Sequence, residues 1–153
     1  MGVAEMGRPT SEFLAGRPLR VLIVDDDQFA ARVTERSFKS SGDFELTYSS
    51  RPSDALQRLE DQISDHSPPF DIVVIDFWFT NDVKDGLDLA DKFFRLSPQT
   101  YVALVTVAKE DELPPDRLAS CGVLMVIEKP LVLGKMAVLL GDVAKFRQEM
   151  QIL

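Results

Sequence analysis

The sequence predicts an α/β protein with a parallel sheet of five strands and five helices. Short apolar runs alternate with helical segments along most of the 153 residues. The run at 71–76, Asp-Ile-Val-Val-Ile-Asp, is continuous and rich in β-branched residues, which is typical of a strand buried on both faces. Strands that alternate with helices pair in parallel through right-handed crossovers, so we expect helices on both faces of the sheet.

The expected strands are the apolar runs of the chain, and a helical segment follows each of them. They span residues 19–24, 44–48, 71–76, 101–105 and 123–127. The second run, Phe-Glu-Leu-Thr-Tyr, alternates between apolar and polar residues and predicts a more peripheral strand.

The expected helices follow from apolar residues at helical spacing and from start and stop signals. They span residues 28–40, about 53–63, 86–96, 110–120 and about 131–150. Asp27 and Ser53 are the expected N-caps of the first two. Pro114-Pro115 either opens or breaks the fourth helix. Residues 1–18 carry Gly and Pro without periodicity, so we expect a flexible N-terminal arm followed by one domain over 19–153.

Composition excludes several classes of protein. The net charge of −8 argues against a nucleic-acid partner, because phosphate binding needs a basic surface. No apolar run reaches the ~18–20 residues that span a bilayer, and Met1–Pro18 lacks the apolar core of a signal peptide. The single cysteine, Cys121, cannot form an internal disulfide. We therefore expect a cytoplasmic protein with no membrane partner.

Chemically reactive side chains follow the ends of four predicted strands. Asp25 and Asp26 follow the first strand, and Asp76 ends the third. Thr106 and Lys129 follow the fourth and fifth. The carboxyl ends of parallel strands share one edge, where ligands bind in open sheets. Two carboxylates ~4 Å apart repel each other by about 4 kcal/mol at an effective dielectric near 20, so a hard divalent cation such as Mg²⁺ is expected there.

Five segments in this order resemble the receiver domain of two-component response regulators, the CheY-like family. They are Val21–Asp27, Asp71–Asp76, Asp85–Ala90, Leu104–Thr106 and Glu128–Pro130. The resemblance covers about Leu19 to Gln148. It implies a flavodoxin-like, doubly wound sheet with strand order 2-1-3-4-5 and a stand-alone receiver domain.

The resemblance also implies a role for each reactive residue. Asp76 would be the phosphoacceptor of a phosphorelay, a nucleophile that takes a phosphoryl group from a histidine kinase. Lys129 would pair with one phosphoryl oxygen, and Thr106 would hydrogen-bond another. Lys129-Pro130 would be a cis peptide. The protein would catalyse only its own phosphorylation and dephosphorylation, and would not be an enzyme in the usual sense.

The implied cofactor is Mg²⁺, held by three carboxylates and one carbonyl. Asp25, Asp26 and Asp76 would supply the carboxylates, and Trp78 would supply its main-chain carbonyl. The implied partners are a histidine kinase or phosphotransfer protein and an output protein that the sequence does not name. The broad apolar stripe of the last helix, which includes Leu133 and Met136, is consistent with either a buried helix or a surface for a homodimer or output protein.

The sequence departs from the family pattern beside Asp76 and Lys129. The loop 77–85 is longer than usual and has no proline. Trp78 and Ala108 occupy positions that, by resemblance, influence phosphoryl lifetime, and neither can orient an attacking water. We therefore expect slow self-dephosphorylation. Val107 is bulkier than usual and is expected to restrict small phosphodonors. Val126 replaces an aromatic residue that often swings inward on activation, which predicts a muted Thr/aromatic switch.

Two alternative functions compete with the phosphoacceptor switch. The altered loop and Val126 favour a receiver-like docking or dimerisation module that works without phosphorylation. A phosphatase of the haloacid dehalogenase type also uses a strand-end aspartate and Mg²⁺. That family needs a second aspartate two residues later, where this chain has Trp78, and a cap domain for which the chain is short.

Overall fold

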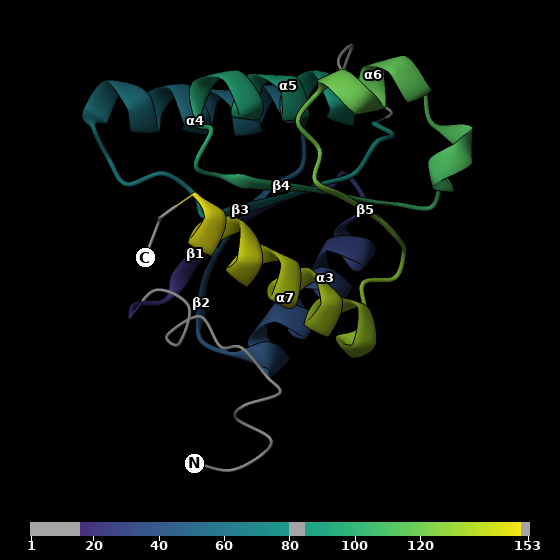
Figure 1. Ribbon diagram of the computed structural model, residues 1–153, viewed down its shortest axis with the longest axis horizontal. Helices are drawn as coiled ribbons and strands as arrows, with labels where there is room; N and C mark the ends of the chain where they lie inside the picture. The colour runs from purple at the N-terminus through teal and green to yellow at the C-terminus, as the bar shows by residue number, and fades with distance from the viewer. Residues whose placement is uncertain (1–15, 80–84, 151–153) are drawn as a thin grey trace.

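The computed structural model describes residues 16–79 and 85–150. A five-stranded parallel sheet forms its middle layer, in the order β2-β1-β3-β4-β5 (Figure 1). The strands are β1 (Leu19–Val24), β2 (Phe44–Ser49), β3 (Ile72–Ile75), β4 (Tyr101–Thr106) and β5 (Met125–Glu128). The predicted α/β class, the five strands and the strand order are confirmed.

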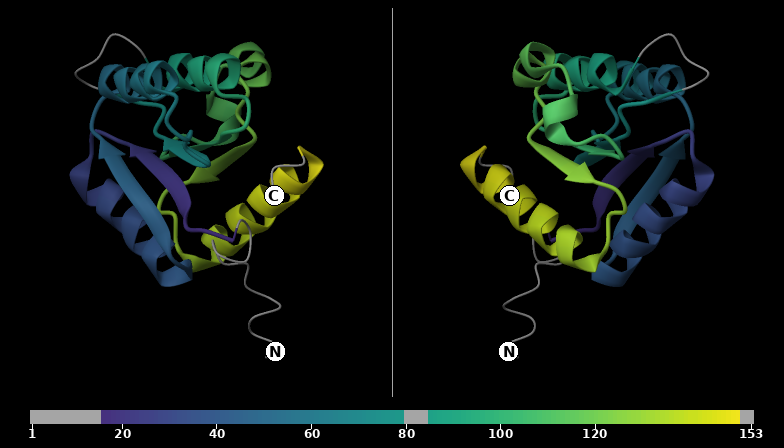
Figure 2. Two further views of the ribbon diagram at one scale, coloured as in Figure 1. Left: turned by 90° about the vertical axis from the view of Figure 1, so that its left-hand side faces the viewer. Right: turned by 90° about the vertical axis from the view of Figure 1, so that its right-hand side faces the viewer.

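Helices cover both faces of the sheet. Among the described residues they are α3 (Gln28–Ser41), α4 (Pro52–Asp65), α5 (Gly86–Leu96), α6 (Pro115–Ser120) and α7 (Leu133–Glu149), with a 3₁₀ turn η1 (Glu110–Glu112) before α6. Helices α3 and α7 lie on one face, and α4, α5 and α6 lie on the other (Figure 2). Two separate apolar clusters fill the two interfaces, because successive side chains of each strand point to opposite faces.

The central strand β3 places the site. All four of its residues are buried, since β1 and β4 flank it and helices cover both its faces. Val24 of β1 pairs with Ile75, and Ile75 pairs with Leu104 of β4. This register brings the carboxyl ends of the three strands to one edge. The residues that follow these strands therefore share a small volume.

Helix boundaries differ from expectation where proline is involved. The Asp27 carboxylate caps α3 as predicted, accepting from the amides of Phe29 and Ala30 at 3.0 and 3.2 Å. The predicted cap at Ser53 is wrong, because α4 begins at Pro52 with Arg51 as an N-cap that makes no side-chain cap bond. Proline suits the first helical turn, where its missing N–H has no helical acceptor.

The helix expected over 110–120 is broken at Pro114-Pro115, which is one of the two outcomes predicted for this proline pair. The structure divides it into η1 and α6, and Pro114 is the extended N-cap residue of α6 with φ −63° and ψ 112°. Proline disfavours the helical conformation in the residue before it, so Pro115 keeps Pro114 extended. Helix α6 consequently has only six residues, and none of them is buried.

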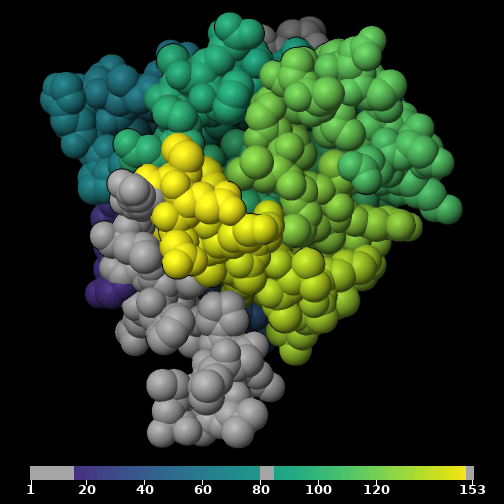
Figure 3. Space-filling model, viewed as in Figure 1, coloured from purple at the N-terminus to yellow at the C-terminus, as the bar shows by residue number. Residues whose placement is uncertain are grey.

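Helix α7 buries only part of its apolar stripe. Met136 and Val143 pack against the sheet at 0% exposure. Leu133 and Val138 are 57% and 64% exposed, on the helix that crosses the front of the space-filling view (Figure 3). The expected homodimer or output surface therefore stays a prediction.

An ion-pair cluster lies at the other end of the sheet, where the strands begin. Asp71 precedes β3, is 5% exposed and accepts hydrogen bonds from the guanidinium of Arg17 at 2.9 and 2.9 Å and from Arg147 at 2.9 Å. The main-chain amide of Arg20 adds a fourth bond at 2.8 Å. Burial raises the pKa of Asp71, but the bonds from Arg17 and Arg20 and the nearby charges outweigh it and hold that pKa below its usual value.

The expected N-terminal arm lies mostly outside the described part of the chain. Residues 1–15 are not described, and Arg17 of the same segment contacts Asp71. Among the residues described, no helix combines the length and apolar character needed to cross a membrane.

Candidate functional site

Three carboxylates converge at the carboxyl edge of the sheet. Asp25 and Asp26 follow β1, and Asp76 follows β3. One oxygen from each lies within 4.8 Å of the others. Asp25 and Asp76 are 5% and 7% exposed, and Asp26 is half-buried. The sequence predicted this convergence, and the parallel register of β1 and β3 produces it.

Lys129 bridges two of these carboxylates. Its Nζ lies 2.7 Å from Asp25 Oδ2 and 3.2 Å from Asp76 Oδ2. The main-chain amide of Lys129 donates to Thr106 O at 2.9 Å, which fixes the exit of β5 against β4. The Lys129-Pro130 bond is cis, in agreement with the resemblance. The lysine thus offsets charge that would otherwise disfavour so compact a cluster.

Burial and ion pairing act in opposite directions on these groups. Burial raises the pKa of Asp25, although the hydrogen bond from Lys129 and the amide of Asp27 oppose it. Burial alone would lower the pKa of Lys129, but its hydrogen bond to Asp25 and the charges of both carboxylates raise the pKa overall. Lys129 is therefore held in its charged form beside the cluster.

Asp76 is held by its own backbone neighbourhood. Its amide donates to Val24 O at 2.9 Å, and its Oδ1 accepts from the amide of Phe77 at 2.8 Å. Gly86, the first residue of α5, packs against the backbone of Asp76 and Phe77, and its amide donates to Phe77 O at 3.0 Å. A Cβ at position 86 would lie 2.1 Å from Asp76 O, so only glycine fits there.

Thr106 lies at the neighbouring strand end but does not contact Asp76. The residue is fully buried, and its Oγ1 accepts a long hydrogen bond of 3.4 Å from the amide of Ala108. The described contacts include no hydrogen bond between Thr106 and Asp76.

The residues that depart from the family pattern surround this edge. Trp78 is 58% exposed, and its ring meets Phe77 edge-on with ring centroids 4.4 Å apart. Val107 is also exposed, whereas Ala108 is buried. Val126 is half-buried against the cluster beneath α4, α5 and α6. Loop residues 80–84 lie outside the described residues, so the expected bulge of that loop is not described.

The donor set fits a hard divalent cation. Carboxylate oxygens with no nitrogen or sulfur ligand suit Mg²⁺ or Ca²⁺, and a small number of protein ligands is typical of Mg²⁺, which retains several waters. Asp25, Asp26 and Asp76 are the side chains that would hold the ion.

One contact at the site was not predicted from the sequence. The hydroxyl of Tyr48, at the end of β2, donates to the main-chain carbonyl of Asp25 at 2.7 Å. A weak signal was present, since Tyr48 ends an alternating strand on the same side as Phe44 and Leu46.

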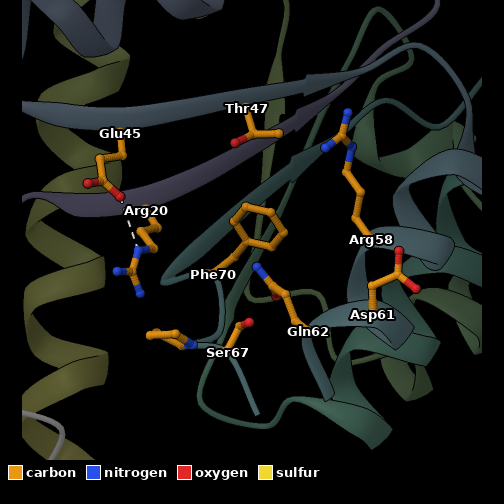
Figure 4. Close-up of a pocket in the computed structure, with 9 residues that line it drawn as sticks. Arg20, Glu45, Thr47, Arg58, Asp61, Gln62, Ser67 and Phe70 are labelled. Atoms are coloured by element: carbon orange, nitrogen blue, oxygen red, sulfur yellow. Dashed lines mark hydrogen bonds and ion pairs between the residues drawn. The ribbon is translucent and has the colours of Figure 1, made fainter. Parts of the chain in front are cut away.

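A polar hollow elsewhere on the molecule is separate from this cluster. Its volume is ≈ 410 Å³, and it is lined by residues from β1, β2, α4 and the connection between α4 and β3, including Arg20, Glu45 and Phe70 (Figure 4). Arg20 and Glu45 pair with each other at 3.0 Å, toward the amino ends of their strands. None of the residues that line this hollow belongs to the carboxylate cluster.

Comparison with known families agrees with this fold. The family model of the response regulator receiver domain matches residues 21–140, which is well over half of the chain. The chain therefore belongs to the response regulator receiver domain family of two-component signalling. A search of curated protein sequences found no match.

Solved receiver structures share the fold at low sequence identity. A CheY-like receiver domain protein from Methanospirillum hungatei JF-1 superposes with a TM-score of 0.72 at 20% identity, covering 87% of this chain and 99% of that one. A response regulator from Thermotoga maritima gives 0.67 at 17% identity, with coverage of 84% and 99%. CheY in the CheX-CheY-BeF3-Mg complex from Borrelia burgdorferi gives 0.70 at 23% identity, with coverage of 84% and 90%.

Proposed function

We propose that this receiver domain is a phosphoacceptor switch in a two-component phosphorelay. A histidine kinase or phosphotransfer protein supplies a phosphoryl group to Asp76, and the phosphorylated form signals by contact with an output protein. The observation that carries the proposal is the convergence of Asp25, Asp26, Asp76 and Lys129 at one sheet edge, with Thr106 at the next strand end.

The transfer needs a positioned nucleophile and neutralised phosphoryl oxygens. An Asp76 carboxylate oxygen attacks phosphorus, the N–P bond of phosphohistidine breaks as the O–P bond forms, and the imidazole leaves with the electron pair. The Phe77 amide and Lys129 hold the Asp76 carboxylate in place before the attack. Lys129 then pairs with a phosphoryl oxygen, and the Thr106 hydroxyl donates to another.

The metal that the carboxylates would hold supplies one further element of this chemistry. A Mg²⁺ ion bound by Asp25, Asp26 and Asp76 would offset the charge of the carboxylates and of the incoming phosphoryl oxygens. The chain itself contributes the orientation of these groups. Lys129 contributes the second positive charge.

Phosphorylation changes the charge at a buried position. An aspartyl phosphate carries nearly two negative charges and three phosphoryl oxygens where the free carboxylate carried one charge, a net gain of about one charge beside Asp25, which is already buried and paired. Such a change acts by favouring one of two conformations of the surrounding loops. We propose that the protein catalyses only the gain and loss of its own phosphoryl group and has no separate substrate. We also propose that the protein and its kinase are in the cytoplasm.

The test is modification of Asp76 itself. The protein is incubated with Mg²⁺ and either acetyl phosphate or a cognate kinase with ATP, and its intact mass is recorded. Beryllofluoride, which mimics the phosphoryl group without transferring one, is added in a separate sample whose Trp78 emission is recorded. We expect the mass of one phosphoryl group, labile in base, and its loss in Asp76→Asn. Asp61→Asn alters an exposed aspartate of α4 that is not part of the carboxylate cluster, and it serves as the control that should still be modified.

The docking module is the second candidate, since Val126 supplies no aromatic ring to swing inward. The same experiment separates the two functions. Absence of modification by every donor, in a protein that still binds its output partner, would favour the docking module and reject the phosphoacceptor switch.

A further inference from the structure

Asp25 is bonded through every polar group that it has. Its amide donates to Ser49 O at 3.1 Å, and its carbonyl accepts from the Tyr48 hydroxyl at 2.7 Å. Its Oδ1 accepts from the amide of Asp27 at 2.9 Å, and its Oδ2 pairs with Lys129 at 2.7 Å. Two of these four partners come from the end of β2, a strand that contributes no side chain to the carboxylate cluster.

The Tyr48 contact depends on the register of β1 and β2. Tyr48 pairs with Ile23, so its side chain lies beside the last residues of β1. The ring packs against the apolar cluster beneath α3 and α7, and the hydroxyl extends past it to Asp25 O. A phenylalanine at this position would keep the packing but would leave the Asp25 carbonyl without this donor.

The Asp25 carbonyl belongs to the peptide plane that also contains the amide of Asp26. Because that plane is rigid, a bond that fixes the carbonyl direction also fixes the direction in which the chain enters Asp26. Asp26 carries the second carboxylate of the cluster. A hydrogen bond at Asp25 O therefore acts on the placement of both carboxylates that follow β1.

We propose that Tyr48 is a positioning residue for the metal site, orienting the Asp25–Asp26 peptide so that both carboxylates face Asp76. The inference rests on the proposed function, since it concerns the ion that phosphoryl transfer would use. It assigns the edge strand β2 a part in metal affinity, in addition to its structural part.

The test is the Mg²⁺ affinity of Tyr48→Phe, measured by calorimetric titration. Removal of one hydrogen bond to a carbonyl is expected to raise the Mg²⁺ dissociation constant about fivefold, equivalent to about 1 kcal/mol. Trp78 offers a second readout, because it is the single tryptophan and lies two residues beyond Asp76, largely exposed.

Tyr101→Phe is the matched control. Tyr101 is the other tyrosine of the chain, and its hydroxyl donates to Asp142 from the amino end of β4. This variant also loses a buried tyrosine hydroxyl, but far from the carboxylates. Its Mg²⁺ dissociation constant is expected to stay within about twofold of the original, a change below 0.5 kcal/mol.

A purely structural role for Tyr48 would give a different result. Mg²⁺ binding raises the unfolding midpoint, and this rise is measured for each protein by comparing samples with and without Mg²⁺. The rise therefore does not depend on any stability that the substitution itself removed. This increase should be smaller in Tyr48→Phe than in the unaltered protein. Equal Mg²⁺ affinities for the two would overturn the inference, as would equal weakening in Tyr101→Phe. Absence of Mg²⁺ binding by the unaltered protein would instead reject the metal site of the proposed function, and this inference with it.

Discussion

Gly86 gives the sharpest test of how the site is built. The start of α5 approaches the Asp76–Phe77 peptide so closely that a Cβ at position 86 would lie 2.1 Å from Asp76 O, 2.9 Å from Asp76 C and 3.0 Å from Phe77 Cα. All three contacts involve backbone atoms, which cannot rotate away as a side-chain end can. Gly86→Ala must therefore move α5 or the Asp76–Phe77 peptide.

The expected size of the effect follows from two opposing contributions. Alanine in place of glycine in a helix ordinarily stabilises by about 0.5–1 kcal/mol. Overpacking a rigid contact costs about 1–3 kcal/mol, and a 2.1 Å approach to backbone belongs at the upper end. We expect a net loss of about 2 kcal/mol in the free energy of unfolding. At about 2–4 °C per kcal/mol for a chain of this size, the melting midpoint should fall by several degrees.

The assay is urea unfolding followed by circular dichroism, with Gly141→Ala as the control. Gly141 lies within α7, and a Cβ there meets nothing within 4 Å, so the same substitution should stabilise the protein by about 0.5–1 kcal/mol. The two glycine variants are thus expected to shift stability in opposite directions. Unchanged or raised stability in Gly86→Ala would refute the argument that this contact is rigid.

Three further variants test other parts of the molecule. Asp71→Asn leaves Arg147, whose side chain is 4% exposed, beside a neutral amide; we expect a loss of about 3–5 kcal/mol at pH 7 by urea unfolding. The folded pKa of Asp71 is lowered, so its contribution is present above the unfolded pKa of about 3.9 and disappears as pH falls through the folded value; a pH-independent loss would contradict this account. Arg117 pairs with Asp85 on the surface, with two N–O distances of 2.8 Å. Arg117→Ala should lower the free energy of unfolding by no more than about 1 kcal/mol. It should also raise the pKa of Asp85, which Arg117 holds below its usual value, as measured by NMR titration. Phosphoryl loss from the isolated Mg²⁺-bound protein should be slow and should quicken in Trp78→Asn, whose amide can orient water; loss within seconds from the unaltered protein, followed by mass spectrometry, would refute the first expectation.

The sequence was sufficient to predict the sheet and the convergence of the site. Continuous runs such as Ile72–Ile75 have one stable place, between other strands and under helices on both sides. Once the strands are parallel, residues at their carboxyl ends must meet, and Asp25, Asp76 and Lys129 do so. These features depend on local pattern and topology alone, so no knowledge of side-chain packing was needed.

The features that the sequence did not indicate depend on side chains meeting across the fold. The Tyr48 hydroxyl finds the Asp25 carbonyl only because of the β1–β2 register. The apolar run predicts only that Asp71 begins a strand. It does not indicate the guanidinium partners of Asp71, because they lie 54 and 76 residues away in sequence. The cap at Ser53 was misassigned because proline at position 52 had already set the first turn of α4.

The Asp71 cluster has a consequence for handling the protein. Arg17 precedes β1 and Arg147 lies in the last turn of α7, yet both bond to one carboxylate. The chain therefore enters and leaves its described part at nearly the same place, on the edge of the sheet opposite Asp76. A fluorescent protein or affinity tag fused beyond either position would emerge away from Asp76. A short linker between the two ends should allow circular permutation, with new termini in the exposed connection between α4 and β3, at residues 66–68.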